Sequence, residues 1–166
     1  MCNSQHDCRR FAILLYRGLQ QAIQSNENHM PFFVQIHPFP GCQLPQSFEE
    51  LARILGRIPG MVFEMDGSFV WVDHHQSPAN QMDGMVYDRA DRIEYVEIKG
   101  TCNAHQWYIL SQTVCGLARP FPFQVKNVDL EMEYSVIDKI ARVHRVAEGD
   151  WTTPSEIASD LGDAAT

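Results

Sequence analysis

The pattern that most constrains the fold lies at residues 82–100, where two strand-like runs flank a tight turn at residues 88–91. Side chains of a strand alternate between its two faces, so Glu97 and Lys99 share one face. A hairpin closed at this turn brings the Asp83 end of the first strand beside the Glu97 end of the second. The sequence therefore predicts two carboxylates and a lysine close together on a sheet.

A second hairpin is predicted at residues 61–73. Asp66-Gly67 lies between the strand-like runs MVFEM and SFVWV, and an Asp-Gly pair flanked in this way is a strong short-range signal for a hairpin. Two further strand candidates are residues 31–37 and residues 120–128. Together these segments predict a small mixed sheet built from hairpins.

The clearest helical pattern covers residues 7–25. Apolar side chains recur there at steps of three and four residues, which gives one apolar stripe along a helix. The stripe consists of Phe11, Leu14, Leu15, Leu19, Ala22 and Ile23, and the other side carries Arg9, Arg10, Arg17 and Gln20. We interpret this segment as a helix that packs on the core or forms a dimer.

Further helices are predicted after residue 46. Ser47 has Glu50 three residues later, which is a capping-box pattern at the start of a helix. Residues 103–116 form the next helical pattern. Residues 130–146 fit either a helix or a strand, and we expect a helix from about Tyr134.

Length and pattern predict one α+β domain, in which a small mixed sheet is flanked by three or four helices. The chain has 166 residues, the usual size of a single domain. We place this domain at residues 1–146. Residues 147–166 are acidic and contain no lysine or arginine, so they form either a mobile tail or a short helix capped by Thr153 and Glu156.

Composition limits the classes of function. No apolar run approaches the roughly 20 residues needed to span a bilayer, and the polar start MCNSQHDCRR does not resemble a signal peptide. The five cysteines include no C-x-x-C pair, so we expect reduced thiols, a cytoplasmic protein and no membrane partner. A net charge of −8 disfavours a large nucleic-acid footprint, but a small nucleic-acid site with a divalent metal stays open.

The order of elements over residues 47–128 is helix, hairpin, a strand with Asp83, a strand with Glu97-x-Lys99, helix and strand. This order, with these residues, resembles the core of the PD-(D/E)xK nuclease superfamily, in which an acidic residue near the start of one strand precedes an E-x-K motif on the next. The proline of the superfamily name is absent, because Met82 precedes Asp83. The resemblance implies a metal-dependent phosphodiesterase of the nuclease type, which is a hydrolase.

The resemblance also assigns roles to the three residues of the motif. Asp83 and Glu97 would bind Mg²⁺ or Mn²⁺, hard cations that prefer oxygen ligands. The metal would lower the pKa of a bound water and neutralise phosphate charge. Lys99 would orient or activate that water and stabilise the transition state.

Three further residues extend this candidate site. An additional acidic ligand is Glu64, on the preceding hairpin, or Glu50, on the helix, and the sequence does not rank the two. Gln106 loosely matches a glutamine that some members of the superfamily carry on the helix after the E-x-K strand, where it would be catalytic.

A structural interpretation stays open beside the catalytic one. An E-x-K pattern is also typical of a solvated sheet face, and Asp-Gly at a strand start is also typical of a turn. On this interpretation the protein is a non-catalytic protein-binding or assembly module, whose first helix and acidic tail contact a protein partner or a second copy. Cys102 and His105 lie close enough in sequence for a nucleophilic pair, but a partly buried thiol is expected instead.

Overall fold

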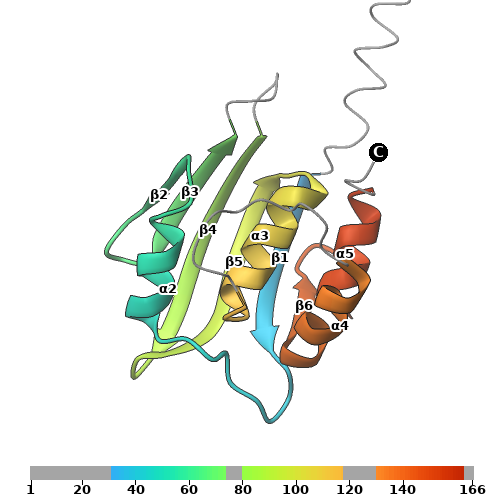
Figure 1. Ribbon diagram of the computed structural model, residues 1–166, viewed down its shortest axis with the longest axis horizontal. Helices are drawn as coiled ribbons and strands as arrows, with labels where there is room; N and C mark the ends of the chain where they lie inside the picture. The colour runs from blue at the N-terminus through green and yellow to red at the C-terminus, as the bar shows by residue number, and fades with distance from the viewer. Residues whose placement is uncertain (1–30, 74–79, 118–129, 163–166) are drawn as a thin grey trace, which may run out of the picture.

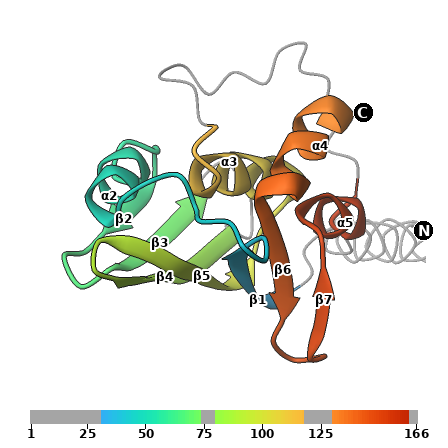
Figure 2. The same ribbon diagram turned by 90° about the horizontal axis from the view of Figure 1, so that it is seen from below.

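The computed structural model describes residues 31–73, 80–117 and 130–162. In this part of the chain, seven antiparallel strands form one sheet with four helices along one side, which is the predicted α+β class (Figures 1 and 2). The strands are β1 (Pro31–Pro38), β2 (Met61–Phe63), β3 (Ser68–Asp73), β4 (Asn80–Arg89), β5 (Arg92–Thr101), β6 (Ala141–Arg145) and β7 (Asp150–Thr152). Their order across the sheet is β2-β3-β4-β5-β1-β6-β7, so β1, the first of the described strands, lies in the interior of the sheet.

Local sequence explains where three of the four described helices begin. The helices are α2 (Phe48–Leu55), α3 (Ala104–Val114), α4 (Leu130–Ile140) and α5 (Pro154–Asp160). The side chains of Ser47, Asn103 and Thr153 each accept a hydrogen bond from the backbone N–H three residues later. Each bond satisfies a donor that the first helical turn leaves free. The helices predicted after Ser47 and at residues 103–116 are therefore confirmed.

Both predicted hairpins are confirmed. β2 pairs with β3 across Asp66-Gly67, and β4 pairs with β5 across Ala90-Asp91. Ala90 and Asp91 have positive φ angles of 53° and 64°, the backbone conformation of a two-residue turn that matches the twist of a sheet. The strand predicted at residues 31–37 is β1.

The structure corrects the helix expected from Tyr134 to residue 146. That helix begins at Leu130 and ends at Ile140, and the next five residues form β6. Ala141 and Val143 are buried, and β6 pairs with the interior strand β1. An unpaired interior strand would leave buried backbone groups unsatisfied, so pairing outweighs the helix spacing here. The predicted helix at residues 7–25 and strand at residues 120–128 lie outside the described residues.

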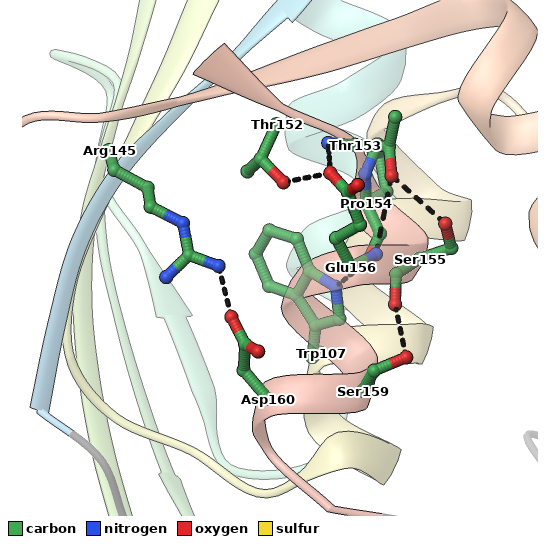
Figure 3. A network of polar contacts seen from close by, with 9 residues as sticks. All are labelled: Trp107, Arg145, Thr152, Thr153, Pro154, Ser155, Glu156, Ser159 and Asp160. Atoms are coloured by element: carbon green, nitrogen blue, oxygen red, sulfur yellow. Dashed lines mark hydrogen bonds and ion pairs between the residues drawn. The ribbon is translucent and has the colours of Figure 1, made fainter. Parts of the chain in front are cut away.

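Residues 150–160 form β7 and α5 and belong to the folded domain (Figure 3). The short helix expected from its capping residues is confirmed. The Thr153 hydroxyl accepts from the Glu156 N–H, and the Glu156 carboxylate accepts from the Thr153 N–H and the Thr152 hydroxyl. These bonds join the edge strand to the helix that follows it.

Two contacts then tie this C-terminal unit to the rest of the domain (Figure 3). The guanidinium of Arg145 on β6 donates to the carboxylate of Asp160 on α5. The indole N–H of Trp107 on α3 donates to the Pro154 carbonyl at 2.9 Å. The position of β7 at the sheet edge is therefore fixed from the helical side.

The side of the sheet that packs on the helices, the covered face, is shielded from solvent. Its central side chains are at most 3% exposed: Val34, Ile36, Met82, Val86, Val96, Ile98 and Val143. The helices contribute Leu51, Leu110, Ile137 and Ile157 to the same core. Packing is closest at Gly84, where an added Cβ would lie 2.0 Å from Cζ of Phe69. Only a residue without a side chain fits beneath that ring.

Candidate functional site

The opposite side of the sheet, the open face, carries none of the described helices (Figure 2). Strand register places its side chains in three rows that cross the strands. The charged row contains, from β2 to β1, Val62, Val70, Asp83, Lys99 and Phe33. The middle row contains, from β3 to β7, Ser68, Met85, Glu97, Gln35, His144 and Trp151. The aromatic row contains, from β4 to β6, Tyr87, Tyr95, His37 and Arg142, together with the Trp151 ring, which reaches His37 and Arg142 from the middle row.

The open face holds the three residues of the E-x-K motif and its preceding aspartate. Asp83 lies directly opposite Lys99, and Glu97 lies opposite Met85. Asp83 and Glu97 are therefore diagonal neighbours on adjacent strands, a relation in which side chains are typically about 7–8 Å apart. The hairpin places Asp83, Glu97 and Lys99 on one face, as strand alternation predicts.

The two carboxylates have different partners. Oε2 of Glu97 accepts a hydrogen bond of 3.0 Å from the side-chain amide of Gln35, which lies on the far side of β5 from Asp83. Oδ1 of Asp83 accepts a hydrogen bond of 3.1 Å from the side-chain amide of Gln81 on its own strand. These contacts draw Glu97 away from Asp83 rather than toward a shared ligand.

The two candidates for a third acidic ligand lie elsewhere. The Glu64 N–H donates to the Ser68 carbonyl in the β2–β3 hairpin, and Ser68 is in the same row as Glu97. Three strand spacings, about 14 Å in all, therefore separate Glu64 from Glu97. Glu50 is exposed on α2, on the side of the sheet opposite Asp83.

Gln106 also lies on the far side of the sheet from the motif. Its side chain is buried on α3, where Oε1 accepts from the Asn103 N–H at 3.2 Å and from the Asn80 amide at 3.1 Å. The Gln106 N–H donates in turn to the Asn103 side chain at 2.8 Å. These contacts cap a helix, and the structure does not bring Gln106 together with Lys99.

The described residues fit a metal site poorly. Among them, no group of three or more His, Cys, Asp and Glu side chains is close enough to hold one ion. Mg²⁺ is commonly bound through one or two carboxylates with water completing its octahedron, but here Asp83 and Glu97 are each bonded to an amide. We therefore derive no reaction step through a metal.

The Cys102 thiol is fully buried rather than partly buried. Burial raises its pKa far above the usual value for a thiol. Burial likewise raises the pKa of Cys115 to about 12. Because the thiolate is the nucleophilic form, neither side chain suits nucleophilic catalysis at neutral pH.

The aromatic row is a continuous series of ring contacts. Tyr87 stacks on Tyr95 with ring centroids 4.4 Å apart, and Tyr95 stacks on His37 at 5.0 Å. The Trp151 ring lies 5.1 Å from His37, edge to face, and the guanidinium of Arg142 lies 3.7 Å from the Trp151 ring centroid. Ring pairs of this kind contribute about 0.5–1.5 kcal/mol each beyond their buried area, so the row is a preorganised surface.

The sequence carries only part of the signal for this row. Tyr95, Glu97 and Lys99 have the same parity on one strand, which places the tyrosine on the face of the charged motif. His37 and Trp151 join Tyr95 only through the pairing of β1 with β5 and with β6. Pairing between strands so distant in sequence leaves no local pattern.

The imidazole of His37 lies between Tyr95 and Arg142 in the row. Burial lowers the pKa of His37 below its usual 6.5, and the nearby Arg142 and His144 act in the same direction. Nε2 of His37 lies 3.1 Å from Oε1 of Gln35, whose amide donates to Glu97. The neutral imidazole is therefore the favoured form, and a hydrogen-bond chain links the aromatic row to the middle row.

The open face exposes apolar side chains at positions that are usually polar on a solvated sheet face. The exposed fractions are 37% for Phe33, 61% for Val62, 36% for Val70, 38% for Tyr87 and 47% for Trp151. These residues belong to five different strands, so the exposure extends across the sheet. They are interspersed with Asp83, Glu97 and Lys99, and a mixture of aromatic, apolar and charged side chains is typical of protein–protein interfaces.

Comparisons of this chain with protein-family models, curated proteins and solved structures found no match. None of the described helices is long and apolar enough to cross a membrane.

Proposed function

We propose that this protein is a non-catalytic binding module whose open face docks an amphipathic helix of a partner protein. The observation that carries the proposal is the exposure of Phe33, Val62, Val70, Tyr87 and Trp151 on the face opposite the helices. A helix with one apolar stripe buries these side chains while its polar side stays in water.

The charge of the protein defines the partner further. The chain carries a net charge of −8, which attracts a basic partner and speeds its encounter. On the open face, Asp83 and Glu97 are balanced by Lys99 and Arg142, so the attraction comes from the charge of the whole chain. The expected partner helix therefore combines an apolar stripe with lysine or arginine residues beside it.

The rigidity of the surface also supports binding. The ring contacts of the aromatic row and the anchoring of β7 by α5 hold Tyr95, His37 and Trp151 in place before any partner arrives. Preordered aromatic side chains lose little conformational freedom on binding, which favours affinity. Aromatic residues are also the side chains most often responsible for interface energy.

The proposal is tested by selecting peptides that bind the full chain from a display library of helical peptides about 20 residues long. We expect selected peptides to be basic and to repeat apolar residues at three- and four-residue steps. Val70→Asp should weaken their binding by at least about tenfold, because a central anchor is commonly worth over 1.4 kcal/mol.

The matched control is Val136→Asp on α4. Val136 is 41% exposed against 36% for Val70, and it lies on a helix rather than on the open face. The control should leave affinity within about twofold. Failure to select any peptide, or equal effects of the two substitutions, would overturn the proposal.

A metal-dependent phosphodiesterase of the nuclease type is the second candidate function. It is favoured by one observation: Asp83, Glu97 and Lys99 share the open face on adjacent strands. Titration with Mg²⁺ and Mn²⁺, alongside DNA and RNA cleavage assays, tests this candidate. Cleavage that is lost in Glu97→Gln and kept in Glu94→Gln would establish it, and the absence of both binding and cleavage in the wild type would exclude it.

A further inference from the structure

The covered face and the open face differ in how much apolar surface remains for an additional helix to pack against. Side chains of α2, α3, α4 and α5 already fill the space over the covered face. The open face has no such layer among the described residues, and its apolar side chains remain exposed. An apolar helix added to this domain therefore has one extended surface to pack against.

The sequence of residues 7–25 predicts a helix that needs such a surface. Its apolar stripe includes Phe11, Leu15 and Leu19, and a helix with a stripe of this width buries it against another element. These residues lie outside the described part of the chain. The stripe predicted for them has the same apolar character as the exposed residues of the open face.

The place where β1 begins brings the segment within reach of the open face. Pro31, the first residue of β1, pairs with Thr101 on the neighbouring strand β5. The chain before Pro31 therefore joins an interior strand, close to Phe33, rather than a strand at the sheet edge. The connecting residues 26–30 span up to about 17 Å when extended, against about 10 Å between packed layers. A helix of 19 residues is about 28 Å long, and β5 with its ten residues is about 34 Å long.

Charge favours the same pairing. Residues 1–30 contain three arginines, Asp7 and Glu27, so their net charge is +1. Because the whole chain has a net charge of −8, residues 31–166 have a net charge of −9. The basic side chains are concentrated on the polar side of the predicted helix. Opposite net charges bring the segment and the domain together.

We infer that the amphipathic segment at residues 7–25 docks in cis on the open face of the same chain. This inference rests on the proposed function, because the segment then occupies the site that a partner helix uses. A short tether gives the segment an effective concentration of the order of millimolar. A partner helix must displace the segment, so only a helix that binds the open face more tightly than the tethered segment can occupy it.

Photo-crosslinking tests the contact directly. Benzoylphenylalanine in place of Tyr87 should crosslink to residues 7–25 in the full chain, as mapped by mass spectrometry. Benzoylphenylalanine in place of Val136, on the helical side, should not. The absence of any crosslink from position 87 to residues 7–25 would overturn the inference.

A mixture of ¹⁴N- and ¹⁵N-labelled protein separates docking in cis from docking onto a second copy. Docking in cis gives crosslinked peptides of a single isotope. Peptides of mixed isotope would show that the segment binds another chain, which contradicts the inference as stated.

Two variants that add one negative charge at different sides of the segment provide a second readout. Leu15→Asp breaks the apolar stripe and should lower the crosslinking yield at least fivefold, whereas Gln20→Asp on the polar side should leave it unchanged. Equal yields in the two variants would contradict docking through the stripe.

The same variants distinguish this inference from the proposed function. Leu15→Asp should raise the affinity for a library-selected peptide by about tenfold, since the competing segment is released. Crosslinks in cis without any selectable peptide would overturn the proposed function alone. Peptide binding that is unchanged by Leu15→Asp would overturn the inference alone.

Discussion

The two faces of the same sheet have opposite characters, although their residues alternate along the same strands. Ile98 on the covered face is fully buried, and its neighbour Lys99 on the open face is exposed. The covered face is filled by helices, whereas the open face combines exposed apolar side chains with ordered aromatic and charged ones. One face therefore determines stability, and the other is available for binding.

The largest expected effect comes from the pair of neighbours on β5. Ile98→Ala leaves a cavity in the covered face and should lower the free energy of unfolding by about 2–5 kcal/mol. Lys99→Ala removes an exposed side chain and should change it by less than about 0.5 kcal/mol. Urea denaturation of both variants measures the difference. Equal losses would mean that the open face is packed as tightly as the covered face.

Gly84→Ala should have the next largest effect. The added Cβ would lie 2.0 Å from the Phe69 ring, so the ring or strand must shift, at an expected cost of about 1–3 kcal/mol. The smaller side chain in Phe69→Leu should relieve the clash, so Gly84→Ala should cost less in that background. A thermal denaturation cycle of the four proteins measures this coupling, and strictly additive losses would contradict the contact.

Thr153→Ala should remove the cap of α5 and lower the free energy of unfolding by about 1 kcal/mol. Thr153→Ser keeps a hydroxyl that accepts from the Glu156 N–H and should preserve most of the stability. Chemical denaturation compares the two variants. A serine variant as unstable as the alanine variant would show that the threonine methyl group, not the cap, matters.

The smallest expected effect is a pH dependence from the aromatic row. The pKa of His37 is lowered below 6.5 in the folded protein, so the unfolded chain takes up the proton first. The contribution of His37 to the free energy of unfolding is therefore fully present above pH 6.5 and is lost as the pH falls through the lowered pKa. Melting temperatures between pH 7.5 and 5 should fall less for His37→Gln than for the wild type, and identical slopes would contradict the prediction.

Sequence patterns predicted the elements that are specified locally. The turns at Asp66-Gly67 and Ala90-Asp91 and the capping residues Ser47 and Thr153 act within a few residues of the chain. Their hairpins and helices could be located for that reason. The charged motif on β5 also had a predictable face, since side-chain direction alternates along a strand.

The parts that could not be predicted depend on contacts between distant segments. Strand β6 exists because β1 needs a partner, and its own residues fit a helix nearly as well. Gln106 follows the E-x-K strand in sequence, but only the packing of α3 shows that it lies across the sheet from Lys99. The aromatic row likewise requires the order of the strands, which joins His37 to Trp151.

The most direct test of the open face as a docking surface is hydroxyl-radical footprinting of the Leu15→Asp variant, whose segment at residues 7–25 should leave this face open, with and without a library-selected peptide. Bound peptide should protect Phe33, Tyr87 and Trp151, which are exposed on the open face. Met132 and Val136, exposed on α4, should keep their oxidation rates. Protection of the two α4 residues with unchanged rates on the open face would contradict the central claim.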